Sequence, residues 1–294
     1  MKLLFSVKCI AAMSRAHNAV QSYKKQNLHA NLILCNFADD MEEIKLSKPL
    51  FSIVTVTWNA ASVLPVTITS IATQSCNSFE WLVIDGESTD GTANLARDAD
   101  ITTARVVSEP DNGLYDAMNK GIRLARGEYL IFLNAGDAFA SPDVLARLAR
   151  CATSHPDVIY GQTQLVDGTG TVIGRRHLTA PSTLDADSFK DGMVVCHQAF
   201  IAKRTLVPTY DLSYRFSADF DWCVRVLKSS DCNVYAGDQP IISYLQQGLT
   251  TANEYSSLLE RFHIMCRHYG VTSTVMRHIG FIPRFLKRKL AHAL

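Results

Sequence analysis

Four short apolar runs, separated by helical patterns, occupy residues 51–134 of this chain. Phe51–Thr57 is a near-continuous β-branched run, which is typical of a strand buried on both faces. Residues 80–85, 105–108 and 128–134 give three more strands of the same kind. Strands that alternate with helices predict an α/β fold with a mainly parallel sheet and right-handed crossovers.

Polar side chains follow the carboxyl ends of these strands. Thr57 and Asn59 end the first run, and Asp85 ends the second. Asp111 and Asp137 come shortly after the third and the fourth. Because ligands of parallel α/β sheets bind beyond the carboxyl ends of the strands, we expect these side chains to surround one site.

The stretch Ser108–Gly121 reads as a strand end, then a turn, then the start of a helix. Pro110–Gly113 holds four turn-forming residues, and apolar residues then recur at helical spacing up to Ala125. A helix N-terminus beside a polar turn suits an anion or a hydroxyl-rich ligand. An ordinary capped helix is the other interpretation.

Composition and missing motifs exclude several classes of protein. The 294 residues are 47% hydrophobic, which suits one large α/β domain or two small ones. A net charge of +1 gives no attraction to nucleic acid, and none is expected as a partner. The eight cysteines form no C-x-x-C pair, as in reduced cytosolic proteins. Thr57–Ala61 lacks the glycines of a dinucleotide-binding turn, and no P-loop motif is present.

The rest of the chain yields further elements but fewer motifs. Residues 1–48 read as an accessory extension, too interrupted by lysine for a membrane span or signal peptide. After Asp137 a hairpin turn at 166–171 marks the start of an antiparallel part. The other expected elements are helices at 60–73, 142–150, 215–228 and 253–269 and strands at 157–164 and 171–176.

Four motifs, in this order and at these spacings, resemble those of a family 2 glycosyltransferase. They are Val54–Asn59, Ile84–Thr92, Ser108–Gly121 and Phe132–Asp137. The match is closest to the branch that includes the colanic-acid-type exopolysaccharide glycosyltransferases, and it covers roughly residues 50–250. The resemblance implies a GT-A fold with a smaller antiparallel acceptor-side part. It also implies a nucleotide-diphosphate sugar as donor, Mg²⁺ or Mn²⁺ as cofactor, and inversion at the sugar carbon.

By this resemblance, Thr57, Asn59 and Asp85 face the nucleoside of the donor, with Asp85 on the base or ribose. Asp90 would shape the loop after the second strand and contact the donor directly. Capping of the next helix is an equally good interpretation of Asp90.

The resemblance assigns Asp111 and Asn112 to the donor-sugar side, although both could simply form the turn. Asp137 is the metal candidate, since a hard cation that bridges diphosphate oxygens needs a carboxylate there. The family's usual D-x-D motif has Asn134 at its first position here, and Gly86 stands where many relatives have a second Asp.

On the acceptor side, the resemblance places His197 and Gln198 near the acceptor or the diphosphate, while a satisfied core histidine is the alternative. Asp219 and Asp221 lie in the first turn of a helix that Ser217 can cap. Acids there stabilise the helix dipole whatever their function. The resemblance nevertheless places the catalytic base at Asp219, with Asp221 in a less regular position.

The last part of the chain could touch a membrane. Residues 241–250 resemble the strand and loop that close the family's site. Residues 271–294 hold five basic residues and no acid beside an apolar stripe, as in helices that lie on anionic membranes. A helix packed on the domain with a solvated basic face is the alternative.

These observations predict an extension at 1–48, a GT-A domain at 49–250 and a helical region at 251–294. The predicted activity is inverting transfer of a sugar to a glycan or lipid-linked acceptor in surface polysaccharide assembly. The enzyme would work in the cytoplasm, at the inner face of the plasma membrane. A non-catalytic nucleotide-sugar-binding protein of the same fold is the alternative, motivated by Gly86 and Asn134.

Overall fold

The computed structural model describes residues 48–246 and 254–279. The chain divides into two compact units, Met1–Lys48 and Pro49–Leu294. All helices and strands that the structure describes belong to the second unit. Most of the predicted extension, the predicted closing loop after residue 246 and the tail beyond residue 279 lie outside the described residues.

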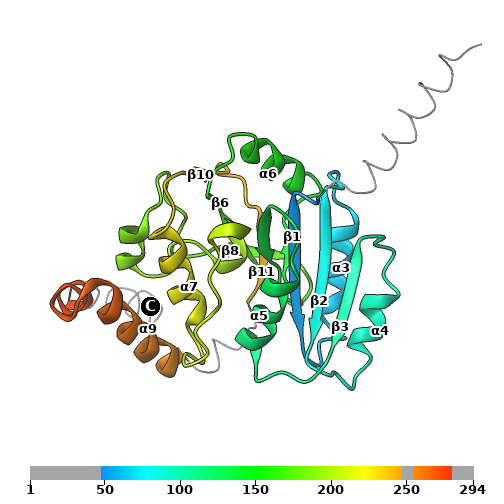
Figure 1. The fold of residues 1–294 in the computed structure, drawn as a ribbon, viewed down its shortest axis with the longest axis horizontal. Helices are drawn as coiled ribbons and strands as arrows, with labels where there is room; N and C mark the ends of the chain where they lie inside the picture. Colours follow the sequence, from blue (N-terminus) through cyan, green and yellow to red (C-terminus); the bar gives the residue numbers. More distant parts are fainter. Residues whose placement is uncertain (1–47, 247–253, 280–294) are drawn as a thin grey trace, which may run out of the picture. The chain divides into compact units, whose positions relative to one another are not determined.

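Seven strands form the central sheet, in the order β10-β6-β9-β4-β1-β2-β3 (Figure 1). Their bounds are β1 Phe51–Thr57, β2 Phe79–Asp85, β3 Ala104–Ser108, β4 Tyr129–Phe132, β6 Val158–Tyr160, β9 Phe200–Lys203 and β10 Asn233–Tyr235. Strands β1 to β4 are parallel, and β9 runs antiparallel between β4 and β6. The predicted α/β fold with a mainly parallel sheet is therefore confirmed.

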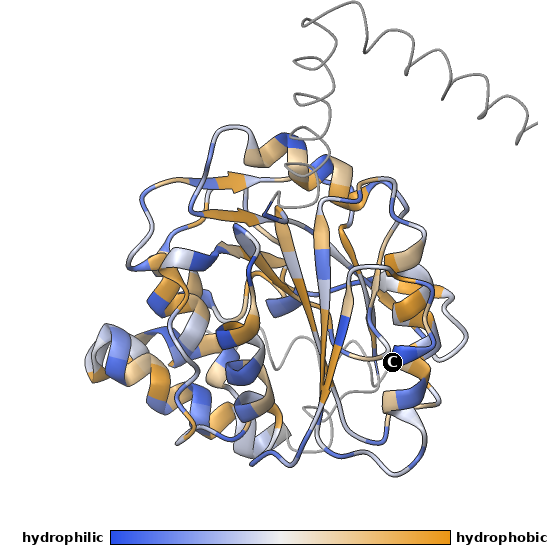
Figure 2. Cartoon of the chain, turned by 45° about the vertical axis from the view of Figure 1, so that its right-hand side comes forward, coloured by the Kyte–Doolittle hydropathy of each residue, from blue (hydrophilic) through white to orange (hydrophobic). Residues whose placement is uncertain are grey.

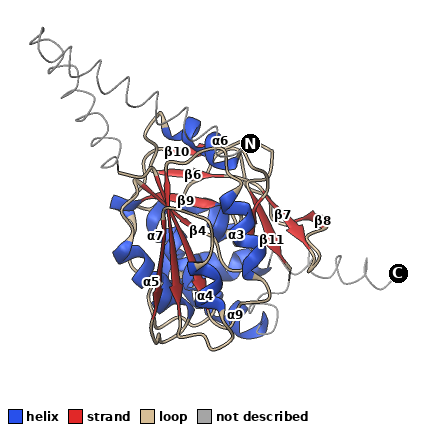
Figure 3. Ribbon diagram, turned by 90° about the vertical axis from the view of Figure 1, so that its right-hand side faces the viewer, coloured by secondary structure: helices blue, strands red, loops and turns tan. Residues whose placement is uncertain are grey.

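Helices cover both faces of this sheet. Those preceding and following β2 lie on one face, and the helix after β3 lies on the other (Figure 3). This arrangement follows from right-handed crossovers when the strand order is β4-β1-β2-β3. The bounds are α3 Leu64–Ala72, α4 Thr92–Arg97, α5 Leu114–Leu124, α6 Val144–Ala152, α7 Ala218–Leu227 and α9 Glu254–Tyr269. Residues 271–279 form one more helical segment, and η1 Ala186–Asp191, η2 His197–Ala199 and η3 Arg204–Leu206 are short 3-10 turns.

One helix begins later than the sequence predicts. The pattern indicated a helix from residue 60, but α3 starts at Leu64. Ala60 accepts backbone hydrogen bonds from Val63 and Leu64, so residues 60–63 form a turn that leads into the helix. Pro65 then lies in the first helical turn, where its missing N–H costs nothing.

A second sheet of four strands has the order β5-β11-β7-β8. Its strands are β5 Ala138–Phe139, β7 Thr163–Val166, β8 Val172–Arg175 and β11 Ile242–Leu245. Strands β7 and β8 form the expected antiparallel hairpin, whereas β11 runs parallel to β7.

The single strand predicted at 157–164 is wrong, because the chain changes sheet in the middle of it. Strand β6 belongs to the central sheet and β7 to the second one. Gly161 lies at the crossing, donates its N–H to the carbonyl of Ala199, and packs so closely on Ile241 that a Cβ there would lie 3.0 Å from its Cδ1. A continuous apolar run does not reveal such a crossing.

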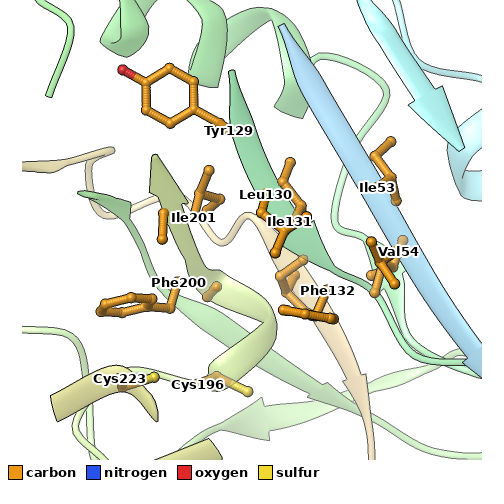
Figure 4. Close-up of a cluster of buried hydrophobic side chains, with 14 of the residues drawn as sticks. Ile53, Val54, Tyr129, Leu130, Ile131, Phe132, Cys196, Phe200, Ile201 and Cys223 are labelled. Carbon is orange, nitrogen blue, oxygen red and sulfur yellow. The ribbon is translucent and has the colours of Figure 1, made fainter. Parts of the chain in front are cut away.

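The core lies between β1, β4, β9 and the helices beside them. Figure 4 shows Ile53, Val54, Ile131, Phe132 and Phe200 packed together, and all five are fully buried. The central strands are hydrophobic along most of their length, while the helices alternate between polar and apolar residues (Figure 2). This close packing fixes the carboxyl ends of the strands, where the polar residues lie.

Candidate active site

Three polar side chains end neighbouring strands in one row. Thr57 of β1 is paired in register with Asp85 of β2, and Asp85 is paired with Ser108 of β3. The sequence predicted Thr57 and Asp85 as neighbours at this edge, and the structure brings them together. The row lies at the carboxyl edge of the sheet, where the loops that follow β1, β2 and β3 begin.

Asp85 is the centre of this row. Its carboxylate is fully buried and accepts hydrogen bonds from the hydroxyls of Thr57 at 2.8 Å and Ser108 at 2.7 Å. Ser88 adds its backbone N–H at 2.9 Å and its hydroxyl at 2.5 Å. Burial alone would raise the pKa of Asp85, but these donors hold it below its ordinary value. Asp85 is therefore ionised and orders three loops, and its contact with a nucleoside stays a prediction.

The loops after β1 and β2 are joined by hydrogen bonds. The N–H of Asn59 donates to the hydroxyl of Ser88 at 2.8 Å, and Asn59 itself has a left-handed φ of 47°. The carboxylate of Asp90 accepts from the N–H of Ala61 at 2.9 Å and of Thr92 at 3.1 Å. Asp90 thus joins the two loops and holds the first residue of α4, although Gly91 and not Asp90 is the N-cap of that helix. Contact of Asp90 with the donor stays a prediction.

The loop after β3 is a tight turn held by its own side chains. Asp111 accepts from the N–H of Gly113 at 2.8 Å, and Asp116 accepts from the N–H of Asn112 at 3.0 Å. A Cβ on Gly86 would lie 2.5 Å from Oδ2 of Asp111. The Asp111 carboxylate therefore fills the space that a second acid at position 86 would need.

Asp137 lies after β4, in a turn beside β11. Its side chain is only 4% exposed and accepts from the Gln198 amide at 2.8 Å and the Leu245 backbone N–H at 3.0 Å. Burial raises the pKa of Asp137 to about 7, although both hydrogen bonds act in the opposite direction. Gln198 and Asp137, which the sequence treated separately, thus form one unit.

Asp137 and Asn134 carry oxygen donors of the kind that a hard cation prefers, although both Asp137 oxygens also accept hydrogen bonds. Oδ1 of Asn134 is buried and has no hydrogen-bond partner within the described part of the chain. A carboxylate and an orphaned amide oxygen are ligands that Mg²⁺ or Mn²⁺ accepts. Among residues 48–246 and 254–279, no group of three or more His, Cys, Asp or Glu could hold a metal ion by itself.

His197 lies in an aromatic cluster. Its Nε2 is 2.5 Å from the hydroxyl of Tyr210, and its ring stacks on Phe132 with centroids 5.0 Å apart. Burial lowers the pKa of His197 to about 4, so the ring is neutral at pH 7. These contacts favour the satisfied core histidine of the two interpretations.

Asp219 lies in the first turn of α7 and faces α5. The hydroxyl of Tyr115, the second residue of α5, donates to Oδ1 of Asp219 at 3.3 Å. This contact joins residues 104 positions apart and brings the acid to the helix that begins at the Asp111 turn. Burial, and then the charge of Asp219, raises the pKa of the Tyr115 hydroxyl well above its ordinary range.

Asp221, two residues after Asp219, has different partners. It is 2% exposed and binds Nε of Arg225 at 2.6 Å and Nε2 of His268 at 2.7 Å. Burial alone would raise the pKa of Asp221, but these partners hold it below its ordinary value. Asp221 borders a cavity of about 330 Å³ that Arg267 also lines. The structure therefore separates the two acids, and an acceptor-side role for Asp221 stays a prediction.

Sequence reasoning did not single out several residues of this region. Ser108 and Tyr115 lay within a recognised motif, but no local pattern distinguished their side chains. Ser108 could have been found once β3 was placed beside β2, because it pairs in register with Asp85. Tyr115 depends on a contact with a distant helix, which the sequence does not reveal.

Comparisons with known proteins point in one direction. The family model described as Glycosyl transferase family 2 matches residues 52–208. A PGL/p-HBAD biosynthesis glycosyltransferase of Mycobacterium bovis is 33% identical over 221 residues, which cover 72% of this chain and 80% of that protein. The putative teichuronic acid biosynthesis glycosyltransferase TuaG of Bacillus subtilis is 33% identical over 153 residues, 51% of this chain and 60% of its own.

Solved structures show the same fold. TarS of S. aureus (residues 1–349), in complex with UDP-GlcNAc, superposes with a TM-score of 0.61. The match covers 79% of this chain and 73% of that one, at 16% identity. At this identity the likeness concerns the fold alone.

Proposed function

Because this chain belongs to glycosyl transferase family 2, we propose that it transfers a sugar from a nucleotide-diphosphate sugar to an acceptor hydroxyl with inversion. That the chain is a glycosyltransferase follows from the family, and the expected GT-A fold is confirmed. The reading as a binding protein without activity is therefore set aside. The inversion, the cation and the residue roles are part of the proposal.

The contact between Tyr115 and Asp219 supports the proposal most directly. It places Asp219, an acid of α7, beside α5. Helix α5 begins after the turn at Asp111 and Asn112, which the resemblance assigns to the donor-sugar side. In a single displacement, the carboxylate of Asp219 would take the proton of the acceptor hydroxyl. The hydroxyl oxygen would then bond to the anomeric carbon as the bond to the diphosphate breaks. One such step inverts the configuration of that carbon.

The donor would lie over the row of Thr57, Asp85 and Ser108. The loops that Asp85 orders would hold the nucleoside, and Asp111 would lie beside it in the space that Gly86 leaves open. Asn134 and Asp137 would hold a divalent cation against the diphosphate. The bound cation would neutralise the charge that develops on the leaving group.

The proposal extends to the acceptor and to the location of the enzyme. We place the enzyme in surface polysaccharide assembly, in a branch near the colanic-acid-type transferases, with a lipid-linked glycan as acceptor at the inner face of the membrane. Relatives are named for PGL/p-HBAD and teichuronic acid biosynthesis, both of which are glycoconjugate pathways. No helix in the described part of the chain combines the length and apolar character of a membrane span.

A thermal-shift screen tests the donor. A ligand that binds the folded state raises its apparent stability, so UDP, GDP, UDP-GlcNAc, UDP-glucose and GDP-mannose are each added with and without Mn²⁺. We expect one nucleotide family to raise the melting temperature, and its sugar to be hydrolysed slowly or transferred. No shift with any nucleotide, and no release of nucleoside diphosphate, would contradict the proposal.

A further inference from the structure

A distant carboxylate holds the turn that precedes Asp219. The backbone N–H groups of three consecutive residues, Arg215, Phe216 and Ser217, all donate to the carboxylate of Glu260. The distances are 2.6, 2.7 and 2.6 Å, short as expected for hydrogen bonds to an ionised acceptor. Glu260 belongs to α9, so a later helix fixes the residues that lead into α7.

The N-cap of α7 gives independent support. Ser217 occupies the cap position but makes no side-chain capping bond to its own helix. Its hydroxyl instead lies 3.0 Å from the hydroxyl and 3.2 Å from the carbonyl of Ser257, again in α9. Both serines are buried. The usual local cap is thus replaced by contacts with α9.

The docking of α9 does not depend on Glu260 alone. Ile264 and Met265 of α9 are buried in the core, and His268 binds Asp221. Loss of Glu260 would therefore release residues 215–217 while the helix stays in place. The residue that such a release would move is Asp219, two positions further along.

We propose that Glu260 is a positioning residue, which fixes the backbone of residues 215–217 and so holds the Asp219 carboxylate beside Tyr115. The catalytic consequence rests on the proposed role of Asp219 as the base. Displacement of a reacting group by about 1 Å can cost on the order of 10²-fold in rate. Glu260 itself touches no substrate and acts only through the turn.

The test combines hydrogen exchange with kinetics on the full chain. Glu260→Ala and the milder Glu260→Gln are compared with Arg277→Ala, which removes an exposed ion pair of 2.8 Å with Asp191. In Glu260→Ala we expect the amides of residues 215–217 to exchange about tenfold faster or more, because their acceptor is gone. Arg277→Ala should leave their exchange unchanged.

Kinetics distinguish positioning from simple stabilisation. Hydrolysis of the donor selected by the thermal-shift screen is followed by release of nucleoside diphosphate. We expect Glu260→Ala to lower kcat by about 10- to 100-fold with KM for the donor within about twofold, and Glu260→Gln to fall between it and wild type. In an Asp219→Asn background the same change should have almost no further effect, because the two residues act as one unit.

Each of these measurements tests a separate part of the proposal about Glu260. Unchanged exchange at residues 215–217 in Glu260→Ala would show that Glu260 does not fix this part of the backbone. Faster exchange with an unchanged kcat would overturn the positioning role, as would a full additional loss in the Asp219→Asn background. A fully active Asp219→Asn variant would show that Asp219 is not the base and that Glu260 has no catalytic effect through it. The exchange data would still show whether Glu260 fixes residues 215–217.

Discussion

Asp219 carries the proposed chemistry at the scale of single residues. We expect Asp219→Asn to keep the fold and donor binding but to lower transfer or hydrolysis by about 10²- to 10⁴-fold, the usual effect of losing a general base. Donor binding is measured by thermal shift and turnover by release of nucleoside diphosphate.

Asp221 provides the matched control two positions away. Its carboxylate binds Arg225 and His268, so Asp221→Asn should lower the melting temperature more than it lowers turnover. If Asp221→Asn is inactive while Asp219→Asn turns over normally, the base is assigned to the wrong acid. If both are active, the base is a residue other than these two acids.

Gly86 tests the donor side. Any side chain there would collide with the Asp111 carboxylate and force the end of that side chain away from its present position. We expect Gly86→Ala to weaken donor binding by about tenfold, as measured by titration calorimetry. Asp111→Gly in the same chain should remove the clash. An unchanged dissociation constant in Gly86→Ala would show that Asp111 can move without consequence.

His197 predicts a pH dependence of stability. Its pKa is about 4 in the folded protein against an ordinary 6.5, so between these values the unfolded chain binds more protons. The contribution of His197 to stability therefore falls as the pH drops from about 6.5 to about 4, by up to about 1.4 kcal/mol for each pH unit.

The variant His197→Gln keeps a polar partner for Tyr210 but cannot titrate. We expect wild type to lose stability relative to this variant when the pH drops from 7 to 5, as measured by the free energy of unfolding in urea. An equal pH dependence in the two proteins would mean that His197 is already protonated in the folded state.

At the scale of elements, the sequence predicts what is locally encoded. Strand β1 has the predicted bounds, and β2 and β3 differ by one residue at their start, because buried parallel strands are continuous apolar runs. The break between β6 and β7 was missed because both halves are apolar. Ser217 holds the predicted N-cap position of α7, which starts at residue 218, but the contacts from α9 that replace its side-chain cap were not foreseen.

The turn after β4 gives a prediction about metal. Asp137 joins this turn to β11 through Leu245, and Asn134, three residues earlier in the chain, has a buried side-chain oxygen without a partner in the described residues. We expect turnover to stop in excess chelator, to return with Mg²⁺ or Mn²⁺, and to be lost in Asp137→Ala. Asp137→Asn keeps a hydrogen-bond acceptor and serves as the structural control. Full activity with chelator, together with wild-type rates for Asp137→Ala, would exclude a metal role.

At the scale of the whole molecule, the strand-end site was predictable and the surfaces between distant helices were not. Thr57 and Asp85 were grouped correctly because parallel strands present their carboxyl ends at one edge. Where α5, α7 and α9 contact one another determines the roles of Glu260, Tyr115 and the Asp221–His268 pair. The hydrophobic periodicity of the sequence does not predict which helices contact one another. The N-terminal extension stays a prediction, since residues 1–47 lie outside the described part of the chain.

The last prediction concerns contact with a membrane. The helical segment 271–279 packs Thr274 inward but leaves Val271, Val275, Met276 and Ile279 exposed, by 39% to 65%. The basic residues that follow, Arg284 and Lys287–Lys289, lie outside the described residues. An apolar row continued by basic residues suits an anionic lipid surface, to which each Lys or Arg adds about 1 kcal/mol.

Deletion of residues 271–294 should therefore reduce sedimentation with anionic liposomes more than it lowers the melting temperature. High salt should weaken binding of the full chain, because the charge contribution is screened. Neutral liposomes are the matched control and should bind both forms weakly. If the deletion leaves partitioning unchanged but destabilises the fold, the segment is a packed helix with a solvated basic face. The exposed apolar row would then need a protein partner, because water alone does not stabilise such a surface.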